Sequence, residues 1–300
     1  MSVPAAYVGI ILIWATTPLA IQWSSESVGF VFGLTARMVL GAVVCLLVML
    51  MLRVRFVWHK EALLAYLASG LGIYAAMICV YWASQYITSG LVSVVYGLLP
   101  MVTTVVAALW LSESLWKANK LVGILLGIVG LLVIFNPEDH LSMATLMGVS
   151  GVLASVVLHS ISMVWVKRIG AQVSPLAQTA GGLWVALPAY LLTWLVLGNE
   201  LPQAIPMKTA LAIVYLAVVG SVLGFMLFYY ALRQVSAGAI ALITLITPVL
   251  ALCIGRVFNN EPLSWQIAVG ALFILLGLAL HHWGDKWLAL MRRSDSQQVG

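Results

Sequence analysis

The sequence predicts an all-α integral membrane protein with ten transmembrane helices, arranged as two inverted-topology repeats of five helices. Three observations support this prediction. The composition is too apolar for a water-soluble surface, long apolar stretches recur along the chain, and one residue pattern occurs twice. Charged residues make up 8% of the chain, whereas soluble domains carry about 25%. With a mean hydropathy of +1.11, most of the surface must face lipid.

Ten segments are apolar and long enough to cross a bilayer, which requires about 20 residues of helix. Their apolar residues do not alternate with a period of two, as in the strands of a membrane barrel. No basic region precedes the first segment, so we expect a permanent span rather than a cleaved signal peptide. The predicted spans are residues 4–22, 30–52, 62–84, 88–111, 117–136, 143–166, 175–197, 208–231, 236–258 and 263–283.

Lys and Arg are distributed unevenly between the two sides of these spans. With the N-terminus in the cytoplasm, the cytoplasmic loops and tail hold eleven basic residues, and the opposite face holds Lys208 and Arg256. Cytoplasmic loops usually carry this excess, so we expect both termini to be cytoplasmic. The asymmetry also explains the net charge of +5 without a nucleic-acid partner.

One pattern occurs twice, and each residue has a twin 148 residues further along the chain. The first copy is Tyr81, Ala83, Gly90, Pro100, Glu113 and Leu115, and the second is Tyr229, Ala231, Gly238, Pro248, Glu261 and Leu263. Because each repeat has an odd number of spans, the second enters the membrane inverted. We expect repeats at 1–136 and 137–285 and a cytoplasmic tail at 286–300. Inverted repeats are typical of secondary transporters, which bind substrate near the midplane between the halves.

The repeated prolines, Pro100 and Pro248, lie near the middle of the fourth and ninth spans. Proline removes a backbone hydrogen bond and kinks a helix, so we expect both to line a cavity or to act in gating. Fixed packing kinks are the alternative. In a continuous helix Tyr96 shares a face with Pro100, and Thr244 occupies the equivalent place before Pro248. We expect Tyr96 and Thr244 to face substrate. The other polar residues on the Tyr96 face are Ser89, Ser93 and Thr103.

Further candidates for the cavity come from aromatic and ionisable residues inside spans. Trp14, Tyr81 and Tyr229 could contact substrate, although Trp and Tyr also decorate membrane interfaces. Arg37 is a candidate partner for a substrate charge because an intramembrane charge is costly; bridging of helices is the alternative. His159 titrates near neutral pH and could handle a proton, or it could be a hydrogen-bonded packing residue.

Other residues point to structural roles or exclude classes of function. Glu113 and Glu261 precede the fifth and tenth spans, where a carboxylate caps free N–H groups, so we expect structural helix caps. No Asp or Glu lies within a span, although proton-coupled transporters often use one. Phosphate-loop, zinc-protease and serine-hydrolase motifs are absent from the sequence. We therefore expect no catalytic residues, no metal site and no cofactor.

The chain resembles the drug/metabolite transporter superfamily, and its EamA family in particular, over essentially its whole length. The resemblance rests on Trp14, on ARMVLGA around Arg37 and on YWASQYITSGLVSVV, which begins at Tyr81. The segments ESLWKANKLVGILLGIVGLLVI and EPLSWQIAVGALFILLGLAL resemble the family's glutamate-to-glycine helix pattern. The resemblance implies a bacterial inner-membrane carrier with a central cavity. Relatives mostly export amino acids, related metabolites or toxic compounds, and smaller relatives use an embedded glutamate that this chain lacks.

Together these observations predict a secondary transporter that exports amino acids or related small metabolites by alternating access. We expect a monomer whose partners are a small-molecule substrate and the lipid bilayer, with His159 as the candidate for proton coupling. The alternatives are a metabolite importer or facilitator, multidrug efflux and, more remotely, an integral membrane enzyme. The nearest candidate for catalysis is HHWGD, which begins at His281 and has no partner cluster elsewhere in the sequence.

Overall fold

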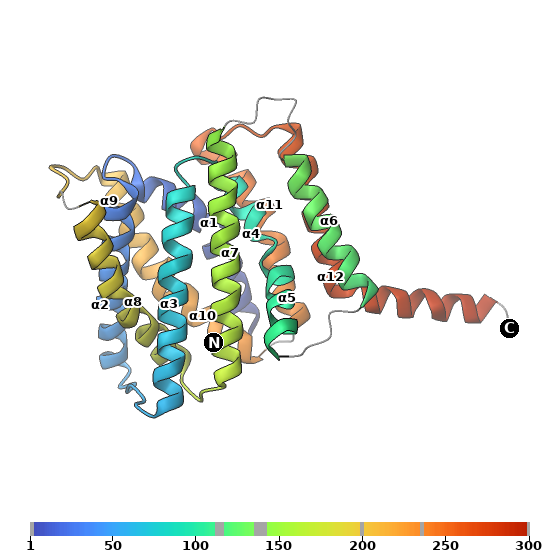
Figure 1. Ribbon diagram of the computed structural model, residues 1–300, viewed down its shortest axis with the longest axis horizontal. Helices are drawn as coiled ribbons and strands as arrows, with labels where there is room; N and C mark the ends of the chain where they lie inside the picture. The colour runs from blue at the N-terminus through green and yellow to red at the C-terminus, as the bar shows by residue number, and fades with distance from the viewer. Residues whose placement is uncertain (1–2, 112–116, 135–142, 199–200, 235–236, 299–300) are drawn as a thin grey trace.

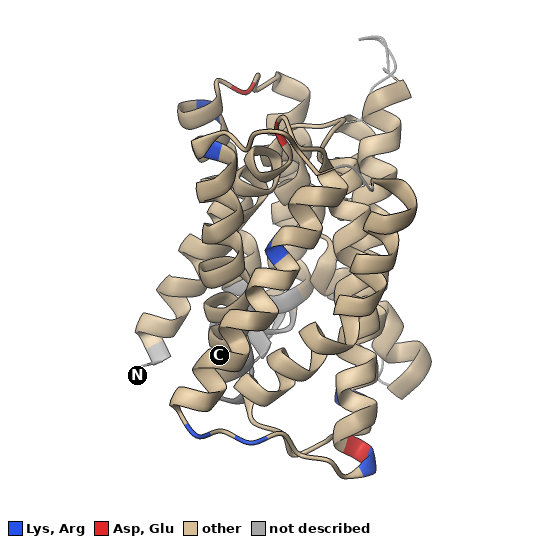
Figure 2. Cartoon of the chain, turned by 90° about the vertical axis from the view of Figure 1, so that its left-hand side faces the viewer, with Lys and Arg blue, Asp and Glu red and all other residues tan. Residues whose placement is uncertain are grey.

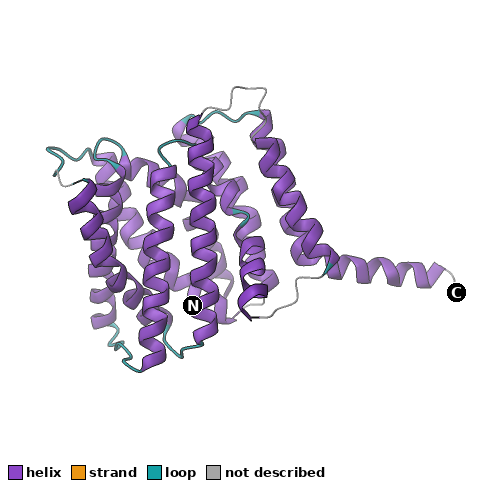
Figure 3. Ribbon diagram, viewed as in Figure 1, coloured by secondary structure: helices purple, strands orange, loops and turns teal. Residues whose placement is uncertain are grey.

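The computed structural model describes residues 3–111, 117–134, 143–198, 201–234 and 237–298, and within these ranges it consists of helices and loops without a strand (Figure 3). Seven helical segments in this part of the chain are long and apolar enough to cross a membrane, and three shorter apolar helices accompany them. The shorter ones cover Ala118–Ile134, Ile243–Asn259 and Trp265–His281. Together they correspond to the ten spans predicted from the sequence.

The helices of the first repeat are α1 to α6, and those of the second are α7 to α12. Their bounds are α1 Val3–Ser25, α2 Phe30–Met51, α3 Lys60–Ala83, α4 Ser89–Tyr96, α5 Leu99–Leu111, α6 Ala118–Ile134, α7 Met143–Ile169, α8 Pro175–Leu197, α9 Met207–Tyr215, the π-helix η2 Leu216–Leu223, α10 Gly224–Gln234, α11 Ala237–Asn259 and α12 Trp265–Gln298.

The two repeats pack against each other along their length rather than forming separate bundles (Figure 1). Helix α3 contacts α7 and α8, while α1 and α4 both contact α11. The largest cluster of buried apolar side chains draws on both repeats and includes Leu34, Met38, Val152 and Leu183. The space at the centre of the molecule is therefore bounded by helices from both halves.

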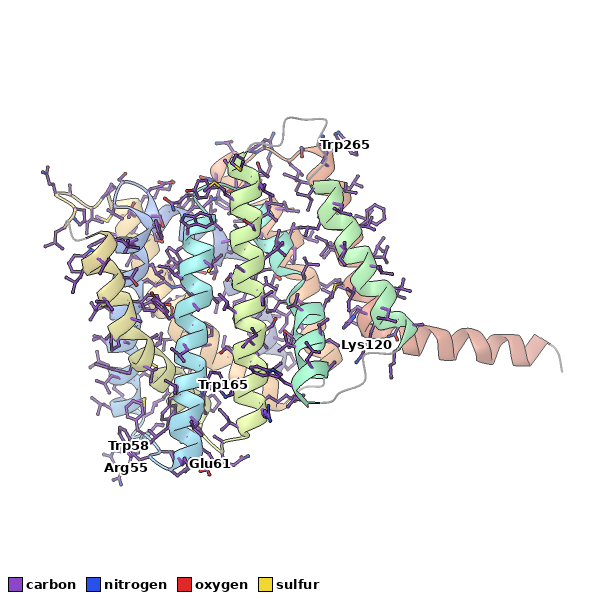
Figure 4. All side chains as sticks on the ribbon, viewed as in Figure 1. Arg55, Trp58, Glu61, Lys120, Trp165 and Trp265 are labelled. Carbon is purple, nitrogen blue, oxygen red and sulfur yellow. The ribbon has the colours of Figure 1, made fainter. Side chains whose placement is uncertain are left out.

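Charged residues gather at the two ends of the bundle, which we call the Arg55 end and the Trp265 end after residues labelled in Figure 4. Figure 2 shows most Lys, Arg, Asp and Glu segments at these ends. At the Trp265 end, Lys208 Nζ donates to Glu26 at 2.9 Å and ties α9 to the loop after α1. Trp58 and Trp265, which are 72% and 63% exposed, lie at opposite ends, as aromatic residues at membrane interfaces do.

The fourth span is not the continuous helix that the sequence predicts. It breaks after Tyr96 and resumes at Leu99, so Pro100 is the second residue of α5. Gly97 N–H donates to the carbonyl oxygens of Ser93 and Val94. The bond to Val94, three residues earlier, is typical of a tight turn at the end of a helix. Proline fits the first turn of a helix because its missing N–H is unpaired there anyway. The single polar face that a continuous helix would carry is therefore divided between two helices.

The eighth span contains a feature that the sequence does not reveal. Residues Leu216–Leu223 form a π-helix between α9 and α10, so the chain crosses this part of the bundle with a wider turn. Stretches of π-helix frequently mark functional sites. This one faces α2 and α1, and it carries Gly220 and Ser221 toward the centre of the molecule.

The last spans of the two repeats, α6 and α12, pack closely at one edge of the bundle (Figure 1). A Cβ atom added to Gly123 or Gly130 would lie 2.6 Å from the carbonyl oxygen of Gly277 or Gly270, respectively. Small residues let membrane helices approach to backbone contact in this way. Helix α12 continues past its apolar part to Gln298 and projects from the bundle in Figure 1.

Candidate functional site

A cavity of about 120 Å³ lies between the two repeats. Its walls come from α1, α2, α3, α4 and α5 of the first repeat and from α7, η2, α10 and α11 of the second. The lining residues are Trp14, Thr17, Pro18, Ile21, Arg37, Met77, Val80, Val92, Ser93, Tyr96, Gly97, Leu99, His159, Gly220, Phe225, Thr244 and Thr247. The site is thus mostly apolar, with hydroxyl groups, one imidazole and one guanidinium, and none of these residues is acidic.

Five residues singled out from the sequence meet in this cavity: Trp14, Arg37, Tyr96, His159 and Thr244. They come from five different helices, and two of those helices belong to the second repeat. A small apolar site with a few convergent polar groups is the usual form of a binding site for a small molecule.

Tyr96 is held in place at the end of α4 by the second repeat. Its hydroxyl lies 2.5 Å from Ser155 Oγ, which in turn donates to the carbonyl oxygen of Ala76 at 2.6 Å. Since the Ser155 hydrogen is used in that bond, Tyr96 donates to Ser155. The chain of bonds runs from α4 through α7 to α3, so it fixes the phenol ring that lines the cavity.

His159 lies on α7 beside Tyr96, with the two ring centroids 6.5 Å apart. Its Nδ1 atom is buried and has no hydrogen-bond partner among the residues that the structure describes. Buried polar atoms in protein interiors nearly always have a hydrogen-bond partner, so an unpaired nitrogen on a residue that lines a cavity points to a functional role.

Arg37 lies on α2, 2% exposed, and roughly 10 Å along the helix from its start at the Trp265 end. Its Nε atom donates to Ser221 Oγ at 3.1 Å, and Nη1 donates to the Tyr81 hydroxyl oxygen at 3.3 Å. The guanidinium carbon also lies 5.8 Å from the centre of the Tyr81 ring. Arg37 therefore joins α2 to α3 and to the π-helix while it lines the cavity.

Tyr81, Pro100 and Pro248 are not among the residues that line the cavity. Tyr81 is fully buried behind Arg37, and Pro100 begins α5. Pro248 lies inside α11, which stays helical through it, and it packs beside Gly97 at the break between α4 and α5. Tyr229 belongs to α10, but its side chain is outside the described residues, as is the whole of Glu113.

Glu261 is placed against a different helix from the one that follows it. Its two carboxylate oxygens accept hydrogen bonds from the backbone N–H groups of Ser89 and Gly90, at 3.0 and 3.1 Å. These N–H groups are at the start of α4, in the other repeat. A carboxylate at this position satisfies two unpaired donors and meets the positive end of the helix dipole.

Glu261 belongs to a hydrogen-bonded group at the Trp265 end, which we call the end cluster: Gln22, Trp23, Asn259 and Glu261. Asn259 Nδ2 donates to Glu261 Oε1 at 3.2 Å and to Gln22 Oε1 at 3.4 Å, while Trp23 Nε1 donates to Asn259 Oδ1 at 3.2 Å. Gln22 Nε2 also donates to the carbonyl oxygen of Ile87 at 2.8 Å. The end cluster therefore ties α1, α4 and α11 together one residue beyond Ile21, which lines the cavity.

Two cavity residues, Gly220 and Phe225, had no signal strong enough for prediction. Glycine and phenylalanine are common in membrane spans; Gly220 lies in the π-helix, and Phe225 lies in α10, which follows it directly. The one available hint was the sequence VGSVLG, in which glycine and serine interrupt an apolar span.

The HHWGD segment has a structural setting. His281 Nε2 lies 3.0 Å from Thr104 Oγ1, and Nδ1 donates to the carbonyl oxygen of Lys120 at 3.2 Å. These contacts join α12 to α5 and α6. In the described part of the chain, no group of three or more His, Cys, Asp or Glu is placed to hold a metal ion.

Comparisons with known proteins agree with this architecture. The model of the EamA-like transporter family matches residues 4–136 and 146–282, one match for each repeat. An uncharacterised transporter of Bacillus subtilis, YoaV, is 25% identical over 280 residues, which cover 91% of this chain and 94% of that protein. A probable amino-acid metabolite efflux pump of Escherichia coli K12 is 25% identical over 207 residues, 66% of this chain and 69% of that protein.

A solved crystal structure shares the fold with a TM-score of 0.68 at 20% sequence identity, covering 96% of this chain and 98% of the other. The two family matches together cover most of the chain, and they divide it near the boundary between the two predicted repeats. The chain is therefore a multi-pass membrane transporter, and it belongs to the EamA-like transporter family.

Proposed function

We propose that this protein is a secondary transporter that exports amino acids or related small metabolites by alternating access around the central cavity. The observation that carries the proposal is the cavity itself, which is lined by both inverted repeats and combines Trp14, Tyr96, His159 and Thr244. Transporters built from inverted repeats place their substrate at the interface between the halves. Because one chain supplies the whole cavity, we propose that a monomer is the transporting unit.

The end cluster supports alternating access because its hydrogen bonds link helices of the first repeat to the second. In the orientation given by the basic loops, with both termini in the cytoplasm of the bacterial inner membrane, the Trp265 end faces outward. Contacts among α1, α4 and α11 would then close the cavity toward the outside. Release of substrate to the outside requires these bonds to open, while equivalent contacts form at the Arg55 end.

The direction and substrate class of the proposal draw on the relatives. Proteins named probable amino-acid metabolite efflux pumps in two bacteria are 25% and 28% identical to this chain. The cavity suits such molecules, because apolar walls receive a side chain and the hydroxyls of Ser93, Thr244 and Thr247 offer hydrogen bonds.

Cysteine accessibility tests the cavity assignment. Cysteine is introduced at Tyr96 or Thr244 in a chain whose three native cysteines are replaced by serine or alanine, and reaction with a small water-soluble thiol reagent is followed. We expect both positions to react and a transported amino-acid metabolite to slow the reaction at both. The control is Val249→Cys, on the same helix as Thr244 but 46% exposed on the outside of the bundle. In lipid it should not react, because the reactive thiolate needs water.

Transport itself is measured in parallel. A deletion strain should accumulate the exported metabolite inside the cell, and complementation should restore its release. If Tyr96→Cys and Thr244→Cys variants that still transport show no substrate-sensitive labelling, the cavity is not the transport site. If the deletion strain instead loses uptake of the metabolite, export is the wrong direction.

A further inference from the structure

We propose that the ligand of the central cavity is an organic monocarboxylate with an apolar body and no free amino group, and that Arg37 Nη2 binds its carboxylate. This inference rests on the proposed transport function and narrows its substrate class. It follows from the hydrogen-bond partners of the buried Arg37 guanidinium, from the missing side chain at Gly220 beside it, and from the absence of acidic residues among the described residues that line the cavity.

Arg37 has no carboxylate partner in the described part of the chain. The acidic side chains described are Glu26, Glu61 and Glu261, and each is used elsewhere: on Lys208, on His59, and on the start of α4. Two of the three guanidinium nitrogens donate to neutral hydroxyls, and Nη2 donates to no described residue. A guanidinium stays charged in proteins, and a buried charge without a counter-ion is costly. A ligand carboxylate would supply the missing charge.

In the wall of the cavity, Nη2 lies beside a glycine. Gly220 lines the cavity, and a Cβ atom added there would lie 3.5 Å from Arg37 Nη2. The absence of a side chain at Gly220 therefore keeps open the approach to the nitrogen that has no partner. The π-helix that carries Gly220 also carries Ser221, which holds Nε and so fixes the direction of the guanidinium.

The rest of the lining argues against a ligand with a free ammonium group. None of the described lining residues is acidic, so an ammonium would find hydroxyl and carbonyl oxygens and the His159 imidazole, but no described carboxylate, while sharing the cavity with Arg37. Two positive charges at close range in a medium of low polarity repel each other strongly. Trp14, Met77 and Phe225 offer an apolar surface for the body of the ligand. Deaminated or N-acylated derivatives of amino acids combine these properties.

The test uses titration calorimetry to measure how four probes that share a phenylethyl skeleton bind to the purified full-length protein in lipid nanodiscs. The probes are 3-phenylpropionate, its neutral amide 3-phenylpropionamide, the zwitterion phenylalanine and the cation 2-phenylethylamine. We expect the carboxylate to bind at least about tenfold more tightly than the amide, since hydrogen bonds to charged groups are the stronger ones. We expect phenylalanine to bind more weakly than the carboxylate, and 2-phenylethylamine to bind most weakly.

Two variants assign the effect to Arg37. Arg37→Gln should bring the affinities of carboxylate and amide together. Because Arg37 also joins three helices, Gly220→Ala provides a second test. Its added methyl would make ordinary contacts, 3.4 Å from Leu216 Cδ2 and 3.5 Å from Arg37 Nη2. We expect this variant to bind the carboxylate more weakly, with a smaller effect on the amide. The matched control is Gly41→Ala, which faces the same π-helix at 3.5 Å from Ser221 Cβ but does not line the cavity.

Each other outcome overturns the proposal. Wild-type protein that binds the amide, the zwitterion or the amine as tightly as the carboxylate, or that does not bind the carboxylate, rejects the monocarboxylate class. An unchanged preference for carboxylate over amide in Gly220→Ala rejects Arg37 Nη2 as the anchor, even if Arg37→Gln does not fold. Tight binding of phenylalanine together with substrate-sensitive labelling at positions 96 and 244 would reject this inference and leave the proposed export of amino acids standing.

Discussion

The imidazole of His159 meets the ring of Tyr96 edge to face, with 78° between the ring planes, inside the wall of the cavity. The two residues come from different repeats, so the pair spans the interface that alternating access would rearrange. Tyr96 is bonded to Ser155, whereas His159 Nδ1 has no partner among the described residues. The imidazole is therefore the group in this pair that has a nitrogen available for a proton.

We expect His159 to couple transport to a proton gradient. His159→Gln keeps a polar side chain but removes the ring nitrogen that could accept a proton, so it should abolish acceleration of transport by an imposed pH gradient while exchange of substrate continues. Flux is measured in proteoliposomes with and without the gradient. The control is His59→Gln, at the exposed start of α3, which should behave as wild type. Full acceleration in His159→Gln would eliminate His159 as the proton site.

We expect the end cluster to restrict access from the outer side. Glu261→Ala leaves the N–H groups of Ser89 and Gly90 without their acceptor, which costs about 1 kcal/mol or more in the closed state and shifts the population several-fold toward the open one. A Thr244→Cys reporter should then react faster with a membrane-impermeant thiol reagent added outside. Glu26→Ala removes an exposed carboxylate from the same end and serves as the control. Equal labelling rates in both variants would show that the cluster does not control access.

We expect the Arg55 end to be cytoplasmic. A reporter enzyme fused after Arg293 should be active as a cytoplasmic fusion, and one inserted at Gln203, in the exposed loop between α8 and α9, should be active as a periplasmic one. Activity on the same side of the membrane for both fusions would contradict the three spans predicted between residue 203 and the tail, and with them the inverted repeat.

We expect the contact between α6 and α12 to be sensitive to a single methyl group. Gly277→Ala would place a Cβ atom 2.6 Å from the carbonyl oxygen of Gly123, so the helices must separate, at a cost of about 1–3 kcal/mol. The thermal unfolding midpoint in detergent should fall. Gly41→Ala, whose Cβ would make contacts of 3.5 Å, should leave the midpoint nearly unchanged. A midpoint for Gly277→Ala that equals the control would place the helices further apart than the structure has them.

The sequence was sufficient to predict the ten spans, because a helix that crosses a bilayer needs about 20 apolar residues whatever it packs against. It was sufficient for the two repeats because the repeated residues recur at a fixed separation in the chain. It could not predict the break after Tyr96 or the π-helix at 216–223, because both leave the hydropathy of the span unchanged. Gly220 could not be predicted either, because its importance lies in the missing side chain beside Arg37, and hydropathy does not reveal which residues meet in space. Tyr81 was predicted to reach substrate, but which face of α3 meets the centre depends on packing, and that packing places its hydroxyl on Arg37.

The bond between Glu261 and the start of α4 also has a consequence for the order in which the protein can be completed during synthesis. Ser89 and Gly90 leave the ribosome long before their acceptor, which follows 172 and 171 residues later. At about 5–20 residues per second, that interval lasts roughly 10–35 s. During this time the first repeat is already in the membrane with two backbone donors awaiting an oxygen that only the second repeat can provide. The nascent first half is therefore incomplete, and the start of α4 reaches its final state only when translation has passed residue 261.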